Sequence, residues 1–174
     1  MIDAMLTAFG VRTGRFTSPH LIDVRERISL EGRPISREGF IAAWEEVEPF
    51  IDLVDADSQA SGGPRLSFFE VFTVMAFAAF ADHPVDAAVV EVGMGGLWDA
   101  TNTMDAGVSV IMPIDLDHTK WLGSSIREIA TEKAGIIKPG QICVIAAQPE
   151  EALDVLLERA REVDAIVRLE GRDF

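Results

Sequence analysis

The residue with the clearest chemical potential in this sequence is Glu91. It is the one charged residue in an apolar run at 87–92, which predicts a strand buried on both faces, and a glycine loop follows it at 93–96. Parallel α/β sheets keep their ligand sites at the carboxyl ends of strands. A carboxylate in this place is therefore a candidate functional group.

Two further polar side chains, Ser18 and His118, also come after predicted strands, at 11–17 and 108–114. Because the strand ends of a parallel sheet share one rim, we expect Ser18, Glu91 and His118 to converge there. A carboxylate, an imidazole and a hydroxyl without thiolates suit a hard or borderline divalent cation, Mg²⁺ or Mn²⁺. The alternative is a separate local role for each residue, such as a turn hydrogen bond at Ser18.

The elements that must position these side chains alternate between strand and helix. This alternation predicts an α/β fold with a mainly parallel sheet and helices on both faces, in one domain or a piece of one. The expected helices lie at 1–9, 36–56, 67–81, from the capping box at Ser125 to Gly135, and at 150–162; the expected strands lie at 11–17, 87–92, 108–114, 141–146 and 165–169, with a hairpin at 25–34.

Three local features refine this expectation. Pro49 should kink the second helix or break it in two. The small, glycine-rich segment at 58–64 is the best candidate for a mobile loop. The helix at 67–81 is apolar nearly all round and should be buried; Phe69 near its start is able to face a ligand, although a core position is the more common fate of a Phe.

The composition disfavours several classes of protein. Asp and Glu number 29 against 15 Lys and Arg, and the net charge of −14 disfavours capture of nucleic acid or anionic lipid. Cys143 is the one cysteine and lies in an apolar run, so we expect a buried structural thiol without disulfides or a thiolate metal cluster. The longest apolar run, at 71–81, is shorter than the roughly 20 residues that span a bilayer. A soluble, acidic, cytoplasmic protein is the expectation.

A strand-end acid that holds Mg²⁺ forms one half of the phosphate site in P-loop enzymes. The other half, G-x-x-x-x-G-K-[ST], does not occur in this sequence. The segment at 135–138 ends a helix instead of opening one, and the glycines at 93–96 have no Lys after them. The residues alone therefore give no further support for nucleotide binding.

Taken together, the motifs resemble the folylpolyglutamate synthase/dihydrofolate synthase family of Mur-type ATP-dependent amide ligases. They occur in the family order across nearly the whole chain, which makes the ordered set highly specific. The matching segments are Thr17-Ser18-Pro19-His20-Leu21, Arg25-Glu26-Arg27-Ile28, Ser67-Phe68-Phe69-Glu70, the stretch from Glu91-Val92-Gly93-Met94-Gly95-Gly96 through Asp99-Ala100-Thr101-Asn102, Asp117-His118 with Trp121-Leu122-Gly123, and Glu132-Lys133-Ala134-Gly135-Ile136.

The resemblance implies a metal site and a modified lysine. Glu91 and His118, with Ser18, are the implied Mg²⁺ ligands, and Lys133 is the implied carbamylated lysine. Carbamylation turns an ammonium into a carboxylate-like anion that is able to approach metal and phosphate. Without the family match, Lys133 would be interpreted as a cation favoured by the dipole at a helix C-terminus.

The resemblance also implies substrates. Ser67, Phe69, Gly96, Asp99 and Ala100 fall where the family places the pterin or folate, and an aromatic face with a carboxylate suits that ring. ATP is implied to phosphorylate a pteroate or folyl carboxylate, and the amine of L-glutamate then attacks the acyl phosphate, with Mg²⁺ and cationic groups stabilising the developing charge. The implied protein is a cytoplasmic monomer.

Three residues depart from the family pattern. Leu97 stands where the family usually has Arg, which removes a cation from a loop that handles anionic substrates. Lys120 replaces a residue that is often Asp, and Asp115 replaces a small one. These departures affect the expected orientation of the substrate more than the expected fold.

The resemblance places a P-loop just before the helix at 1–9 and a glutamate-binding domain after Phe174. We therefore expect residues 1–174 to be a single partial domain, a ligase fragment that is inactive alone. The alternative hypothesis is a non-catalytic pterin-binding or interaction module. The strand that precedes the P-loop is normally central in such a sheet, and its loss would expose apolar edges of neighbouring strands, which favours aggregation or dimerisation.

Overall fold

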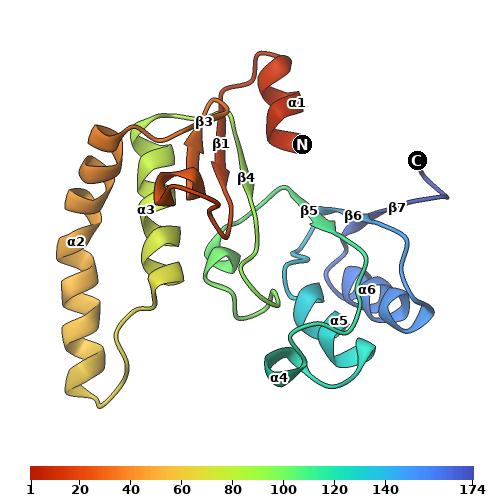
Figure 1. Cartoon of the computed structure of the whole chain (residues 1–174). Coiled ribbons are helices and arrows are strands. Elements are labelled where there is room, and N and C mark those ends of the chain that lie inside the picture. The colour runs from red at the N-terminus through yellow and green to blue at the C-terminus, as the bar shows by residue number, and fades with distance from the viewer. The chain divides into compact units, whose positions relative to one another are not determined.

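The computed structural model describes residues 1–174, which form two compact units, Met1–Gly93 and Met94–Phe174. Each unit has its own sheet and its own hydrophobic core (Figure 1). Both units combine helices with parallel strand pairs, which confirms the predicted α/β class. The strands lie in two hydrogen-bonded sheets, whereas the sequence predicted one.

The first unit contains a mixed four-stranded sheet in the order β3-β2-β1-β4. β1 (Thr13–Phe16) pairs in parallel with β4 (Ala87–Val90) and antiparallel with β2 (Ile28–Leu30), which forms the predicted hairpin with β3 (Arg33–Pro34). β4 is an edge strand, and its Ala88 is exposed. The prediction that this strand is buried on both faces is wrong, because burial requires neighbours that an edge position does not supply.

Helices pack against this first sheet. They are α1 (Ile2–Ala8), a short 3₁₀ helix (Val24–Arg27), α2 (Arg37–Ala60) and α3 (Phe68–Asp82), and α2 and α3 lie side by side as an antiparallel pair (Figure 1). Their shared core includes Phe16, Ile28, Val47, Met75 and Phe80.

Three features of these helices differ from the sequence predictions. α2 continues through Pro49 without a break. The proline has no N–H to donate to the carbonyl oxygen of Glu45, but Glu45 is exposed, so this carbonyl lies on the solvated side of the helix. Residues 58–60 belong to α2, so the following loop is shorter than predicted. The Ser58 hydroxyl donates to the carbonyl oxygen of Pro64 at 2.7 Å and connects the end of the helix to this loop. α3 is less completely buried than predicted, since Phe68 and Val74 are exposed.

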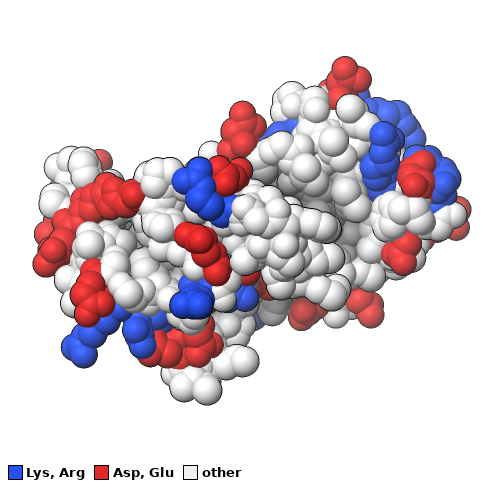
Figure 2. All heavy atoms as spheres, turned by 90° about the horizontal axis from the view of Figure 1, so that it is seen from above, with Lys and Arg blue, Asp and Glu red and all other residues white.

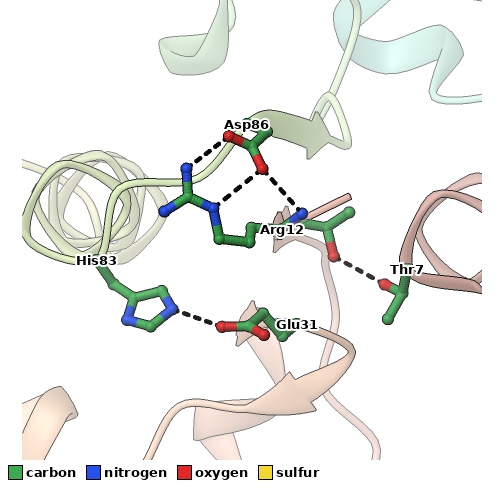
Figure 3. Close-up of polar contacts among 6 residues, drawn as sticks. Thr7, Arg12, Glu31, His83 and Asp86 are labelled. Atoms are coloured by element: carbon green, nitrogen blue, oxygen red, sulfur yellow. Dashed lines mark hydrogen bonds and ion pairs between the residues drawn. The ribbon is translucent and has the colours of Figure 1, made fainter. Parts of the chain in front are cut away.

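Polar contacts connect the ends of several elements in the first unit (Figure 3). The Arg12 guanidinium donates from Nη2 to Asp86 Oδ1 at 2.6 Å and from Nε to Asp86 Oδ2 at 3.0 Å. His83 Nε2 lies 2.8 Å from Glu31 Oε1. These contacts join the start of β1 to the segment before β4, and the end of α3 to the β2–β3 turn.

The second unit contains a three-stranded parallel sheet in the order β5 (Val108–Ile111), β6 (Ile142–Ile145) and β7 (Ile166–Leu169). β5 ends earlier than predicted, because Pro113 has no N–H for a strand ladder. One face of the sheet packs into the core of the unit. The opposite face exposes apolar side chains, at Val108, Val110, Ile142 and Ile166.

Helices of the second unit cover the buried face. They are α4 (Thr119–Leu122), α5 (Ile126–Ala134) and α6 (Glu150–Glu162), with a 3₁₀ helix at Ala100–Thr103. α5 and α6 pack side by side and bury Ile129, Ala130, Ala152 and Leu156 in the same core as Cys143 (Figure 1). The predicted bounds of α6 are confirmed, and Ser125 caps α5 in the predicted capping box with Glu128.

The surface carries mixed charges. On the face shown in Figure 2, Lys and Arg side chains are interspersed with Asp and Glu and separated by uncharged surface. None of the helices combines the length and the apolar character needed to cross a lipid bilayer.

Candidate functional site

Ser18 and Glu91 meet at the carboxyl ends of β1 and β4. The parallel register places Phe16 opposite Val90, and the Glu91 N–H donates to the carbonyl oxygen of Phe16 at 2.9 Å. Beyond this point the backbone N–H of Ser18 donates to Glu91 Oε2 at 2.8 Å. The Glu91 side chain is exposed, so its carboxylate is anchored through one oxygen and remains open to solvent.

The segment after Ser18 is held by a second carboxylate, that of Glu26. Its two oxygens accept hydrogen bonds from the backbone N–H groups of Leu21, Ile22 and Asp23, at 2.9, 3.1 and 2.8 Å. These backbone donors hold the pKa of Glu26 below its ordinary value. The turn is therefore preorganised, while the Leu21 and Ile22 side chains point into solvent, with 90% and 92% of their surface exposed.

Phe69 packs against the core of the first unit, as the structural alternative predicted. Its ring centroid lies 5.6 Å from that of Phe16. A Cβ atom added to Gly93 would lie 2.4 Å from Phe69 Cζ, so the close approach of this ring requires glycine there. Ser67 is the N-cap of α3, where its hydroxyl accepts from the Glu70 N–H at 3.3 Å and the Glu70 carboxylate accepts from the Ser67 N–H at 2.7 Å.

In the second unit, the segment after the glycines folds back on itself around Asp99. One carboxylate oxygen accepts from the Thr101 N–H at 3.0 Å and from the Thr101 hydroxyl, and the other accepts from the Met94 N–H at 2.9 Å. Asp99 thereby caps the 3₁₀ helix that contains Ala100. The carboxylate predicted to contact a pterin has a structural role in shaping the loop.

Lys133 lies in the last turn of α5 and is half-buried. The glycine loop approaches this turn closely, because the Leu97 N–H donates to the carbonyl oxygen of Glu132 at 2.9 Å. A Cβ atom on Gly96 would lie 2.6 Å from the same oxygen and 3.0 Å from the carbonyl oxygen of Lys133. The structure therefore brings together Gly96 and Lys133, which the sequence assigned to different tasks.

His118 occupies a left-handed backbone conformation, with φ of 51° and ψ of 34°, at the start of α4. Few residue types other than glycine accept this conformation readily, and His is among those enriched in it. The imidazole is exposed, and its Nδ1 lies 3.6 Å from Asp117 Oδ1. Nearby, the Lys120 ammonium lies 5.2 Å from the centroid of the Trp121 ring, a cation–π contact at one of the departures from the family pattern.

Of the three predicted metal ligands, the structure brings Ser18 and Glu91 together, while His118 belongs to the second unit. Nowhere in the chain do three His, Cys, Asp or Glu side chains gather in an arrangement typical of a metal site. The donors at the end of β1 and β4 fit a hard cation in kind, because Glu91 offers carboxylate oxygen and Ser18 offers hydroxyl oxygen.

A separate hollow of about 330 Å³ lies in the first unit, beside the β2–β3 hairpin, α2 and the end of α3. Its lining includes Arg33, Ser36 and His83, and none of the residues that the sequence predicted as functional. The predicted site residues therefore do not line this hollow.

Sequence reasoning missed two residues of the second unit, Asn102 and Lys138. Asn102 Nδ2 donates to the carbonyl oxygens of Leu97 at 3.1 Å and Gly135 at 3.2 Å. Lys138 Nζ donates to the carbonyl oxygens of Asn102 at 2.6 Å and Met104 at 2.7 Å. Asn102 belongs to a matched family segment, but most of the bonding partners of these two side chains are backbone groups more than 30 residues away, so the motif does not reveal the contacts.

Both the sequence and the structure of this chain are similar to those of known proteins. Over its full length the chain is 52% identical to the dihydrofolate synthase/folylpolyglutamate synthase of Mycobacterium tuberculosis and covers 38% of that protein. A crystal structure of Mycobacterium tuberculosis folylpolyglutamate synthase complexed with ADP and AMPPCP matches with a TM-score of 0.92 and 52% identity, over 98% of this chain and 39% of that one. Escherichia coli FolC, in complex with DHPP and ADP, matches with a TM-score of 0.84 and 33% identity, over 98% of this chain and 38% of that one. No family model matches the chain.

The structural matches define the class of protein: the chain has part of the α/β fold of a Mur-type ligase. The sequence matches then define the family. The chain belongs by homology to the folylpolyglutamate synthase/dihydrofolate synthase family, and it spans between 19% and 38% of the length of the curated relatives it matches.

Proposed function

We propose that this chain is the central part of an ATP-dependent amide ligase that adds L-glutamate to dihydropteroate or to a folate. The observation that carries the proposal is the family match over the entire chain, which includes a relative solved with ADP and AMPPCP and another solved with DHPP and ADP. We further propose that the 174 residues are inactive alone, because they contain no G-x-x-x-x-G-K-[ST] motif to cradle phosphates.

Within this proposal, Glu91, Ser18 and His118 hold Mg²⁺, or Mn²⁺ in its place. The anchored but exposed carboxylate of Glu91 and the hydroxyl of Ser18 support the assignment in donor type. When bound, the cation supplies charge neutralisation at phosphate oxygens. Glu91 is held by the Ser18 N–H, which orients the carboxylate before any ligand arrives.

Lys133 is proposed to carry a carbamate. In this step the unprotonated Nζ attacks the carbon of CO₂, an N–C bond forms, and the displaced proton leaves to solvent, so that a cation becomes an anion. Support comes from the family match and from the position of Lys133 in the last turn of α5, where no carboxylate pairs with its ammonium.

The pterin or folate is proposed to contact Ser67, Phe69, Gly96, Asp99 and Ala100, as the family resemblance implies. Phe69 is half-buried, and Asp99 retains acceptor positions beyond its hydrogen bonds within the loop. Leu97, with 44% of its surface exposed, stands in place of the family's usual Arg and weakens the expected attraction for an anionic substrate.

ATP-dependent addition of labelled L-glutamate to dihydropteroate and to tetrahydrofolate tests the proposal. We expect no turnover by the 174 residues and measurable turnover when they replace the matching segment of the Mycobacterium tuberculosis relative. The same chimaera with Lys133→Ala is the matched control and should lose turnover. Turnover by the 174 residues alone would overturn the inactivity proposal, and an inactive but folded chimaera would overturn the ligase proposal.

A non-catalytic pterin-binding module is the second candidate, favoured by the exposed Leu97 and by the absence of a P-loop motif in these residues. Calorimetric titration with dihydropteroate and with MgATP separates the two. Pterin binding without nucleotide binding supports the module, whereas a chain that binds neither ligand contradicts it.

Self-association of the 174 residues is a related expectation. β4 ends one sheet, and β5 and β7 end the other, so that each offers an unpaired backbone edge within its sheet. Sedimentation velocity at several concentrations measures the outcome: we expect dimers or larger species, and a single monomeric species would contradict this.

A further inference from the structure

The side-chain amide of Asn102 bridges the glycine loop and the end of α5. It donates one hydrogen to the carbonyl oxygen of Leu97 at 3.1 Å and one to that of Gly135 at 3.2 Å. Leu97 follows the paired glycines, and Gly135 is the C-cap of α5, two residues after Lys133. One side chain therefore joins the loop to the helical turn that carries Lys133.

The two backbones that Asn102 joins are also in direct contact. A Cβ atom on Gly135 would lie 2.4 Å from Leu97 Cα, and one on Gly96 would lie 2.6 Å from the carbonyl oxygen of Glu132. The Leu97 N–H donates to that same oxygen. Because no side chain fits between the two segments, the loop and the helix end fit together in a single register.

Lys138 supports Asn102 from the other side. Its ammonium donates to the carbonyl oxygen of Asn102, within the 3₁₀ helix at Ala100–Thr103, and to that of Met104, the C-cap of the same helix. Lys138 is half-buried, and the two hydrogen bonds involve a charged donor, which makes them stronger than neutral ones. Lys138 thus fixes the backbone of Asn102, and the Asn102 amide fixes the loop on α5.

We propose that Asn102 and Lys138 are positioning residues for Lys133. They hold the glycine loop and the last turn of α5 as one body, so that the pterin-binding loop and the carbamylated lysine keep a fixed separation. The inference rests on the proposed function above for the roles of the loop and of Lys133. It assigns a role to two residues outside the proposed sets of metal and substrate ligands.

Hydrogen exchange with mass spectrometry on the 174-residue chain tests the connection directly. In Asn102→Ala we expect about tenfold faster exchange in two peptides at once, the one that contains Leu97 and the one that covers 134–137, with β6 unchanged. Thr103→Ala is the matched control, because the Thr103 hydroxyl bonds only to the Ala100 carbonyl oxygen in the same 3₁₀ helix.

Lys138 provides a second and independent pair of variants. Lys138→Met should reproduce the effect of Asn102→Ala, and Lys138→Arg should restore protection, since a guanidinium is able to donate to both carbonyl oxygens. Faster exchange in the loop alone, equal loosening of every peptide including β6, or no change in any variant would each overturn the proposal. If Asn102→Ala does not fold, the Lys138 pair decides the question.

Chemical trapping of the carbamate reads out the effect on Lys133. The chain is equilibrated with ¹³CO₂, alkylated to fix carbamates, and the labelled fraction at Lys133 is measured by mass spectrometry. We expect at least a fivefold lower fraction in Asn102→Ala and Lys138→Met, and a normal fraction in Lys138→Arg and Thr103→Ala. Equal labelling in all variants would overturn the positioning role. An unlabelled parent chain would contradict the proposed role of Lys133, and the exchange data would still decide whether the loop and helix move together.

Discussion

Replacing Gly96 by alanine places a methyl group where the structure has no room for one. The added Cβ would lie 2.6 Å from the carbonyl oxygen of Glu132, 3.0 Å from that of Lys133 and 3.1 Å from Lys133 Cα. All three are backbone atoms of α5, so no side chain is able to rotate away. Ordinary contact begins at 3.4 Å, which means that the loop and the helix end must separate by about 0.8 Å.

This separation has a cost that can be bounded. Overpacking of this kind costs roughly 1–3 kcal/mol, and strain on the hydrogen bond between the Leu97 N–H and the Glu132 carbonyl oxygen adds about 1 kcal/mol. For a chain of this size each kcal/mol lowers the melting temperature by roughly 2–4 °C. We therefore expect Gly96→Ala to melt about 5–15 °C below the parent chain.

Thermal unfolding followed by far-ultraviolet circular dichroism measures the difference. If the two units melt separately, the shift should be confined to the transition of Met94–Phe174 and should be about twice as large in degrees, because a smaller unit unfolds with a smaller entropy change. Gly107→Ala is the matched control, because a Cβ there meets nothing within 4 Å, and we expect a change within about 0.5 kcal/mol. A Gly96→Ala chain that melts with the Gly107→Ala chain would refute the steric reasoning.

Three further outcomes are expected. Burial raises the pKa of the fully buried Cys143 thiol, so iodoacetamide at neutral pH should label it only after unfolding; labelling of the native chain at the rate of a free thiol would contradict this. Hydrogen bonds from Arg25 lower the pKa of Asp23 from 3.8 to about 2, and those from Arg12 lower the pKa of Asp86 below 3.8. Because both carboxyl groups have a lower pKa in the folded chain than in the unfolded chain, they stabilise the fold above about pH 4, and this stabilisation is lost as the pH falls towards 2. Urea midpoints between pH 7 and 2 should therefore fall less steeply in Asp23→Asn, and parallel curves would count against the assignment. Ser125→Ala removes the N-cap of α5 and should lower stability by about 1 kcal/mol, whereas Thr131→Ala, at an exposed position of the same helix, should change it by less than about 0.5 kcal/mol; equal melting curves would argue against the cap.

Much of the fold is predictable because its local signals are strong. The bounds of α6 follow from its helical period, and the capping box of Ser125 and Glu128 marks the start of α5. The meeting of Ser18 and Glu91 follows from the rule that parallel strands end on one rim. Local periodicity and capping depend on neighbours in the sequence, so the sequence alone reveals them.

Other features depend on partners that are distant in the sequence. The edge position of β4 depends on which strands pair with β1, and apolar content does not encode that choice. The helical continuation through Pro49 depends on solvent access to the carbonyl of Glu45, which a propensity rule ignores.

The sequence by itself determined the family, the candidate ligands and the presence of a glycine loop after Glu91. Only the tertiary structure decided why glycines are required at particular positions. Gly96 and Gly135 are glycines because two backbones touch, and Asn102 and Lys138 matter because they bond to carbonyl oxygens. Backbone carbonyls are identical at every residue, so a sequence carries no mark of which ones a side chain binds.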